Sequence, residues 1–260
     1  FRRVLFRSNA TGGDSFRALI GSASDIVAAG IASGPVPTTG PRALTGAPVI
    51  GEQITVGGDL TAALGAASPA NGTAQPGAQD VPMLQIALSA RAEPVEIRTI
   101  TFQTSGSGDE ALDIAQARLL FDANGNGVSD AGDVTLGSPQ SFAADNGQIS
   151  FVLPAEIIPA NATRNYLLVY DLTGNPTGAE TFEARVVDAS GISAFGQASI
   201  APVTATGAYP LLGRTLTLLG GLSITTGPEN PGTYRVQPNA QGIATLQLRS
   251  EEHTSELQSR

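Results

Sequence analysis

The sequence predicts an all-β fold, a sandwich of short antiparallel strands. Apolar residues occupy every second position in Phe182 to Val186 and in Ile149 to Leu153, so each segment has one apolar face. Gly, Pro, Asn and Ser residues form turn signals between such segments, as at Asn146-Gly147. Only Asp109 to Gln116 has a helical pattern, and it is about two turns long.

Two strands have patterns of their own. Tyr166 to Tyr170 is almost continuously apolar, which is typical of a central strand that is covered on both faces. Farther back in the chain, Val95 and Ile97 fall on one face of a strand, whereas Ile100 falls on the other. This change of phase predicts a β-bulge near Arg98-Thr99.

The composition excludes several kinds of site. The 260-residue chain has no Cys, no Trp and no Lys, and its only histidine is His253. Without these side chains there is no Cys or Lys nucleophile, and no Cys and His set for structural zinc. Of these kinds of catalysis, only catalysis by carboxylates remains open. Because the other kinds are excluded, we predict that the chain is not an enzyme.

Both ends of the chain are predicted to be foreign to the natural protein. Residues 1–8 (FRRVLFRS) and 249–260 (RSEEHTSELQSR) resemble in-frame translations of adapter oligonucleotides from sequencing libraries. A basic arm and an acidic helical tail are the alternative. Without these ends, nine arginines and 20 acidic residues remain, and the arginines are scattered singly. This charge balance argues against a nucleic-acid partner and suits divalent cations better.

The chain also contains an internal repeat with a period of about 162 residues. Phe16 to Gly30 aligns without gaps on Phe182 to Gly196, and seven of the 15 positions are identical. Two further matches follow in the same order, Gly51 to Leu60 with Gly213 to Leu222 and Gln75 to Gln85 with Gln237 to Gln247.

A repeat of this length indicates a tandem array of whole domains. We expect residues 9–57 to be the C-terminal part of a preceding module, residues 58–219 a complete module, and residues 220–248 the first strands of a following module. Convergence of two Ala- and Gly-rich segments is the alternative. The neighbouring modules of the same chain are then the first expected partners.

One stretch matches the twelve-position calcium loop: Asp122 to Asp133, with the sequence DANGNGVSDAGD. Alternate Asp and Asn side chains in a tightly coiled segment bring several oxygen atoms to one point, as a hard cation requires. Gly127 stands at the position of the sharp turn. The predicted ligands are five side chains and one backbone carbonyl, those of Asp122, Asn124, Asn126, Asp130 and Asp133 and that of Val128.

Two features set this loop apart from an EF-hand or a dockerin. Asp133 replaces the usual Glu at the last position and two ligands are neutral Asn, so we expect a weak Ca²⁺ site with a Kd of about 10⁻⁴ to 10⁻³ M. Ala117 to Phe121 before the loop and Val134 to Leu136 after it have strand patterns, where those families have helices. A turn that binds no ion is the alternative.

A family resemblance extends over most of the chain. The segments ARLLFDANGNG, NYLLVYDL and TFEARVVDASGISAFG, in that order, resemble the tandem immunoglobulin-like repeats of large prokaryotic cell-surface and S-layer-associated proteins. The resemblance implies an immunoglobulin-like sandwich in an extracellular stalk, coat or adhesin. It supplies no ligand.

Other candidate sites are weaker. Glycosidases use pairs of carboxylates, and Glu93 with Glu96, or Asp109 and Glu110 with Asp113, are such candidates. We interpret them as solvated loop acids, with Asp113 as a candidate helper near the calcium ion. The four tyrosines are expected to pack in the fold instead of stacking on sugars: Tyr166, Tyr170, Tyr209 and Tyr234.

The sequence therefore favours a non-enzymatic structural or adhesion module on a bacterial or archaeal surface, made rigid by calcium. An accessory module of a secreted enzyme, one that binds polysaccharide, is the alternative. Other surface proteins or glycans are further expected partners. No apolar run approaches the roughly 18 residues of a transmembrane helix.

Overall fold

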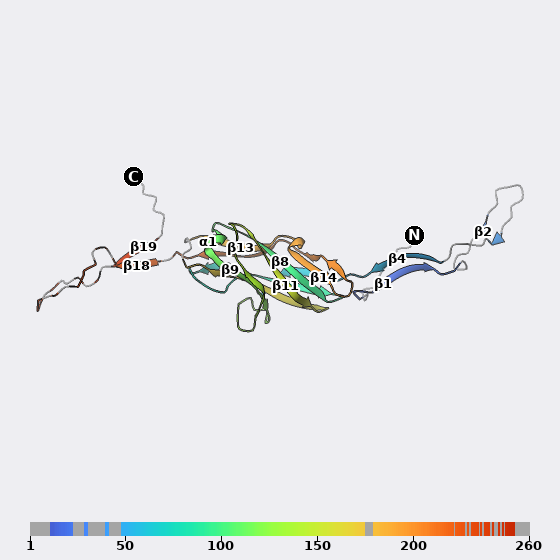
Figure 1. Ribbon diagram of the computed structural model, residues 1–260, viewed down its shortest axis with the longest axis horizontal. Helices are drawn as coiled ribbons and strands as arrows, with labels where there is room; N and C mark the ends of the chain where they lie inside the picture. Colours follow the sequence, from blue (N-terminus) through green and yellow to red (C-terminus); the bar gives the residue numbers. More distant parts are fainter. Residues whose placement is uncertain are drawn as a thin grey trace, which may run out of the picture.

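The protein is a β-sandwich, as the computed structural model shows (Figure 1). This confirms the predicted all-β fold class. The structure describes residues 11–22, 29–30, 40–41, 48–174, 179–220, 222–226, 228, 230–233, 235, 237–239, 241, 244, 246 and 248–252. Two sheets face each other across one apolar core, and their strands run from residue 59 to residue 218.

The first sheet has six strands. Its spatial order is β10 (Val134–Gln140), β9 (Ile114–Asp122), β12 (Ala162–Leu172), β7 (Val81–Arg91), β5 (Asp59–Leu64) and β16 (Ala205–Gly207). All neighbours are antiparallel except β16, which runs parallel to β5.

The second sheet has seven strands. Its order is β15 (Ala201–Val203), β14 (Ile192–Gly196), β8 (Val95–Gly106), β13 (Thr181–Val186), β17 (Leu211–Leu218) and β6 (Gly72–Ala74), and β11 (Gln148–Ile158) pairs with the other side of β8. Two short helical turns lie between strands: α1 (Glu110–Asp113) and η2 (Ala189–Gly191). The first of these lies inside the segment predicted to be helical.

The core is made by the apolar faces that the alternation predicted. Phe102 and Phe151 are fully buried, and their rings meet edge to face with centroids 6.1 Å apart. Phe142 makes the same kind of contact with Tyr170, with centroids 5.7 Å apart. Such aromatic pairs add to the stabilisation from burial alone.

The predicted bulge is present in β8. Ser193 of β14 pairs with Thr99 and the next residue, Ala194, pairs with Ile97, so Arg98 is the extra residue. The guanidinium carbon of Arg98 then lies 4.2 Å from the ring centroid of Phe195, which is an attractive cation–π arrangement. The bulge therefore allows both Ile97 and the following apolar residues to face the core.

Strand β12 is the central strand that its sequence predicted. Every residue from Tyr166 to Leu172 is buried. Alternate residues face the main core, whereas Leu167 and Val169 form a second cluster with Leu120 of β9 on the opposite face of the sheet. That opposite face is therefore also covered.

Three strand pairs lie outside the sandwich. They are β1 (Ser15–Ile20) with β4 (Val49–Thr55), β2 (Ala29–Gly30) with β3 (Gly40–Pro41), and β18 (Leu222–Thr226) with β19 (Leu248–Glu252). The first pair lies beyond the end of the sandwich that carries β14, and the last beyond the opposite end, near α1 (Figure 1). Of the two adapter-like ends, residues 1–8 and 253–260 lie outside the described residues, whereas residues 249–252 belong to β19.

The pair β1 and β4 has the same hydrogen-bonding register as β13 and β17. Adding 166 to each β1 number and 162 to each β4 number converts the pairs Ser15↔Thr55 and Phe16↔Ile54 into Thr181↔Thr217 and Phe182↔Leu216. The register shift comes at the same point in both pairs, after the third paired residue. The division of the chain into modules stays a prediction.

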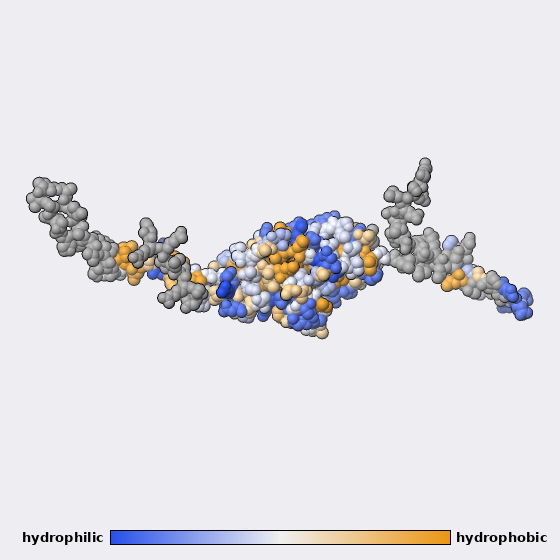
Figure 2. All heavy atoms as spheres, turned by 180° about the vertical axis from the view of Figure 1, so that it is seen from behind, coloured by the Kyte–Doolittle hydropathy of each residue, from blue (hydrophilic) through white to orange (hydrophobic). Residues whose placement is uncertain are grey.

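The surface of the sandwich is mixed. Figure 2 shows apolar atoms in patches bordered by hydrophilic residues on one face. Large apolar side chains are exposed at several separate positions, including Leu112, Val152 and Ile200. Within the described part of the chain, no helix has the length and apolar character needed to span a membrane.

The core contact of Phe151 gives a test of the fold. Phe151→Ala should lower the free energy of unfolding by about 3 to 5 kcal/mol, because it removes a fully buried ring and leaves a cavity. Val152→Ala, at a neighbouring side chain that is 67% exposed, should change it by less than about 0.5 kcal/mol. Urea denaturation measures both, and equal losses would contradict the two-sheet arrangement.

Candidate metal centre

The predicted calcium loop joins two neighbouring antiparallel strands at the edge of the six-stranded sheet. Strand β9 ends at Asp122 and β10 begins at Val134, which pairs with Phe121. The loop is thus flanked by strands on both sides, as its sequence predicted. No helix of the EF-hand kind adjoins it in this described region.

Asp122, the first residue of the loop, is buried and accepts four hydrogen bonds. One carboxylate oxygen, Oδ1, accepts from the backbone N–H groups of Gly125 (2.7 Å) and Asn126 (3.2 Å). The other, Oδ2, accepts from the N–H of Gly127 (2.8 Å) and from the side-chain amide of Gln85 (2.6 Å). Because only 1% of Asp122 is exposed, these donors take the place of water.

Three of the predicted ligands meet at one point in the outer part of the loop, an oxygen of Asp130. The Nδ2 atoms of Asn124 and Asn126 donate to the same oxygen of Asp130, at 2.7 and 3.0 Å. The other oxygen of Asp130 accepts from the N–H of Gly132 (2.9 Å). These three donors lower the pKa of Asp130, the N–H of Gly132 most of all.

The backbone is coiled by local side-chain to backbone bonds. Asn124 Oδ1 accepts from the N–H of Asn126 (3.0 Å), and Asn126 Oδ1 accepts from the N–H of Val128 (2.8 Å). Asp133 closes the loop, since its two oxygens accept from the N–H groups of Ala123 (3.1 Å) and Asp130 (3.2 Å). Bonds of this type explain why Asp and Asn recur at alternate positions.

Gly127 is the residue that lets the loop lie against the sandwich. Its φ of 72° is in the left-handed region, and a Cβ at this position would lie only 1.9 Å from the carbonyl oxygen of Ala67. The Ala67 N–H in turn donates to the side chain of Gln85 (2.9 Å). The connection after β5 therefore packs between the loop and β7.

The side chains of this arc carry the oxygen atoms that a hard cation prefers. No group of three or more Asp, Glu, His or Cys side chains is placed to hold a metal within the described residues. The convergent set is one carboxylate, Asp130, with the amides of Asn124 and Asn126. A half-turn of each amide would turn its oxygen toward this point and give three oxygen donors there, but it would break the bonds that the two amide oxygens accept from the N–H groups of Asn126 and Val128.

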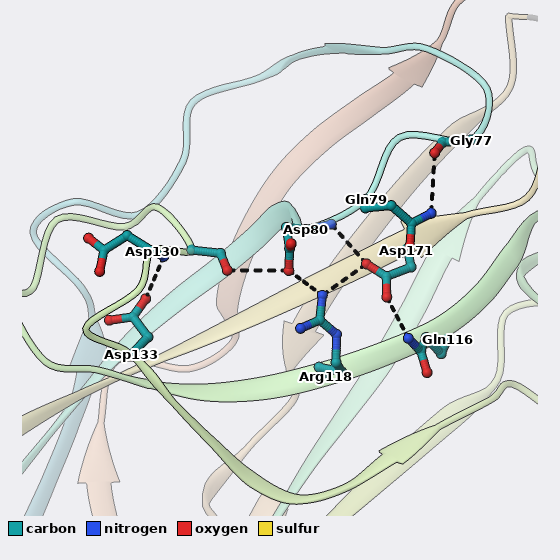
Figure 3. Close-up of polar contacts among 9 residues, drawn as sticks. Gly77, Gln79, Asp80, Gln116, Arg118, Asp130, Asp133 and Asp171 are labelled. Atoms are coloured by element: carbon teal, nitrogen blue, oxygen red, sulfur yellow. Dashed lines mark hydrogen bonds and ion pairs between the residues drawn. The ribbon is translucent and has the colours of Figure 1, made fainter.

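A network of charged and polar side chains lies beside the loop (Figure 3). The guanidinium of Arg118 on β9 contacts Asp80 and lies 3.0 Å from a carboxylate oxygen of Asp171 on β12. Asp171 also accepts from the N–H of Asp80 (2.8 Å) and the amide of Gln116 (2.6 Å). Burial opposes the ionisation of Asp171, but these donors outweigh it and lower its pKa.

The network and the loop border a shallow depression of about 350 Å³. Ser129 of the loop donates to Asp80 (3.3 Å), which connects the two. The depression is lined by six polar residues and two apolar ones: Asp80, Arg118, Leu120, Ser129, Asp130, Ala131, Asp133 and Thr135.

The sequence did not indicate the residues that support the loop. Gln85 and Asp171 lie on strands 37 and about 49 positions away from Asp122 along the chain. The only signal for them in the sequence is that both are polar residues in largely apolar strands. The alternation of side chains along a strand places each of them on the outer face of the sheet, but it does not say which loop covers that face.

The interpretation of two groups of acids as solvated was wrong for three of them. Glu93, Glu110 and Asp113 are 1%, 0% and 7% exposed. Two of them accept hydrogen bonds from backbone N–H groups: Glu93 from Ala198 and Ser199, and Glu110 from Asn146 (2.6 Å). Turn residues whose carboxylates bind backbone N–H groups lose their need for water.

Asp113 lies close to the side chain of Glu180 at the α1 end of the sandwich. Burial of Glu180, with the nearby carboxylates of Asp113 and then Asp109, raises the pKa of Glu180 to about 7. Asp113 and Asp122 stand at opposite ends of β9, so Asp113 does not reach the calcium loop.

The tyrosines follow the packing expectation where the structure describes them. Tyr166 and Tyr170 are fully buried, and Tyr209 packs against the core. Tyr234 lies outside the described residues.

Comparison of the chain with protein-family models and with curated proteins finds no match. The proposals below therefore rest on the geometry and the sequence of this chain alone.

Asp122→Ala should destabilise the sandwich even without metal. The substitution leaves four buried hydrogen-bond donors without their acceptor. We therefore expect the free energy of unfolding to fall by about 2 to 4 kcal/mol in EDTA. Asp59→Ala, at an exposed strand end, should cost less than about 0.5 kcal/mol. Guanidinium denaturation gives both values, and a neutral Asp122→Ala would show that the loop is not anchored as described.

Glu180 should make stability depend on pH. Its folded pKa of about 7 lies above the ordinary 4.5, so between these values the folded state holds a proton that the unfolded chain has lost. The contribution of Glu180 to the free energy of unfolding therefore falls as the pH rises from about 5 to 8. Glu180→Gln should remove this fall and raise stability at pH 8 by about 1 to 2 kcal/mol, a value reduced for partial exposure. Thermal denaturation at several pH values across this range measures the effect. If the stability of the unaltered chain and that of Glu180→Gln changed equally with pH, the assignment would be contradicted.

Proposed function

We propose that this chain is a non-enzymatic structural module of a bacterial or archaeal extracellular surface protein. In this proposal the sandwich is immunoglobulin-like, belongs to a tandem array, and is stiffened by calcium bound at the loop from Asp122 to Asp133. The observation that carries the proposal is the shared register of the β1–β4 and β13–β17 pairs, including the position of the register shift.

The tandem arrangement is supported by more than sequence identity. Two unrelated strand pairs have no reason to share their pairing, their break in register and the turn that precedes the first strand. Gly13 and Ala179, which precede β1 and β13, both have a left-handed φ, of 87° and 65°. A side chain such as Ala adopts this conformation rarely, so its recurrence points to a common fold.

The calcium proposal assigns ligands by the oxygen donors on one short arc. The set predicted from the sequence is the side chains of Asp122, Asn124, Asn126, Asp130 and Asp133 and the carbonyl of Val128. Because four donors already occupy the oxygens of Asp122, this residue would serve as the anchor and the other five would hold the ion. When bound, calcium supplies a positive charge that ties the outer part of the loop to its base. The chain itself contributes the anchor, because Asp122 and Gly127 already fix the loop on Gln85 and Ala67.

A structural role fits the engagement of Glu93 and Asp122 better than catalysis does. Glu93 and Asp122 are saturated by backbone and side-chain donors. A catalytic acid or base needs a lone pair or proton that faces substrate. The burial of Tyr166 and Tyr170 also removes two rings on which a polysaccharide would stack.

Calorimetric titration of the full chain with CaCl₂ tests the proposal. We expect saturable binding with a Kd of about 10⁻⁴ to 10⁻³ M, because few of the ligands are charged: Asp130 and Asp133, with Asp122 held in the base of the loop. Asp130→Ala should abolish the heat, since it removes an exposed ligand, whereas Asp59→Ala should leave it unchanged. The absence of heat for the unaltered chain would end the calcium proposal, and saturable binding on a glycan array would favour the polysaccharide-binding alternative.

A further inference from the structure

The turn before β1 is seated on the sandwich at the end opposite α1. This turn, Thr11 to Asp14, is closed by a bond from the N–H of Asp14 to the carbonyl of Thr11 (3.0 Å). The N–H of Gly12 donates to the carbonyl of Ala92 (3.1 Å), in the turn between β7 and β8. Gly12 is buried although it belongs to a segment outside the two sheets.

Glu93 builds the surface on which this turn sits. Its Oε2 accepts from the N–H groups of Ala198 (2.6 Å) and Ser199 (2.7 Å), and its Oε1 accepts from the hydroxyl of Ser199 (2.6 Å). These residues belong to the turn between β14 and β15, so one carboxylate joins two turns that are more than 100 residues apart in sequence. We call this surface the Glu93 socket, made of residues 91–94 and 196–200.

The contact is so close that it needs glycine. A Cβ at Gly12 would lie 2.4 Å from the Cβ of Glu93, and one at Gly196 would lie 2.4 Å from its Oε1. Gly13 passes over Ala198, where its Cβ would lie 3.0 Å from that of Ala198. The turn and the socket therefore fit backbone against side chain, with no room for a further atom.

Both halves of this contact recur in the sequence at the spacing of the repeat. Thr11 to Asp14 reads TGGD and Thr177 to Glu180 reads TGAE, whereas Gly196 to Ser199 reads GQAS and Gly30 to Ser33 reads GIAS. The residues that touch Glu93, a glycine, an alanine and a serine, are those that are retained in the second socket sequence.

In the repeat of the turn, residues 179 and 180 are described, and their backbone makes the same hydrogen bonds as Gly13 and Asp14. Gly13 donates to Val56 O (2.8 Å), as Ala179 donates to Leu218 O (3.0 Å). In return the N–H of Val56 donates to the carbonyl of Asp14 (2.7 Å), as Leu218 donates to Glu180 (2.8 Å).

We propose that successive modules dock end to end, with the turn of each module seated in the Glu93 socket of the next. The occupant of the socket in this chain is the turn Thr11 to Asp14, and the partner of the other end is the socket of a following copy of the same module. The proposal rests on the tandem arrangement proposed above. It adds a second connection between modules besides the covalent linker at Gly57, where an added Cβ would meet no atom within 4 Å outside the neighbouring residues of the chain.

Two connections make a joint stiffer than one. A chain joined only through Gly57-Gly58 rotates about its flexible backbone, because glycine has few steric restrictions. A turn seated beside that linker removes this freedom, since bending the joint would pull Gly12 away from Glu93 and Ala92. The array then behaves as a rod, which suits a stalk or a coat.

Disulfide trapping in the full chain tests the joint, and the absence of native cysteine makes the result unambiguous. Gly13→Cys with Ala198→Cys should oxidise in air at least about tenfold faster than Gly57→Cys with Ala198→Cys, because a seated turn gives the pair a high effective concentration. In 6 M urea the two pairs should oxidise at similar rates. Adding Gly12→Val to the first pair should reduce its rate to that of the control pair.

Equal rates for the two pairs in native buffer would overturn the joint, as would rapid oxidation that survives Gly12→Val. Circular dichroism of the same variants checks that the sandwich is folded in each. A calcium titration of the chain reports on the loop at the edge of the six-stranded sheet and not on the socket. Failure of the joint and failure of the calcium proposal are therefore seen separately.

Discussion

A buried carboxylate at the end of one strand organises this edge of the sandwich. Asp122 is the last residue of β9, and its oxygens are saturated by three backbone N–H groups of the loop and by Gln85 of β7. The cost of removing this charge from water is offset by these donors, so the loop must keep the shape that presents them. The positions of Asn124, Asn126 and Asp130 follow from that shape.

The socket at the end of the sandwich uses the same physical device. Glu93, like Asp122, is an acid at a strand boundary whose carboxylate binds backbone N–H groups. Those bonded to Glu93 come from a distant turn, whereas those bonded to Asp122 come from its own loop. In both places glycine allows another segment to approach closely, Gly127 over Ala67 and Gly12 over Glu93. A chain without disulfides thus holds its turns in place with buried carboxylates. One such site would stiffen the module and the other would join it to its neighbour.

Much of the fold follows from periodicity, and most of what does not is long-range. Alternation predicted the strands, the bulge at Arg98 and the central strand β12, because each depends on which face of a strand is apolar. The burial of Glu93, and of Asp122 under Gln85, was not foreseeable, since the donors come from segments far apart in the chain. The loop's spacing predicted its coiled backbone, but it did not reveal that the amides of Asn124 and Asn126 turn their hydrogens toward Asp130.

Hydrogen exchange of the loop measures the central claim, that calcium stiffens an arc already anchored by Asp122. The N–H groups of Gly125, Asn126 and Gly127 are bonded to Asp122, so in EDTA they should exchange more slowly than those of an open turn. With calcium at a few millimolar, above the expected Kd, mass spectrometry should find slower exchange in the peptide that spans the loop and no change in β12. Identical exchange of the loop peptide with and without calcium would contradict the account.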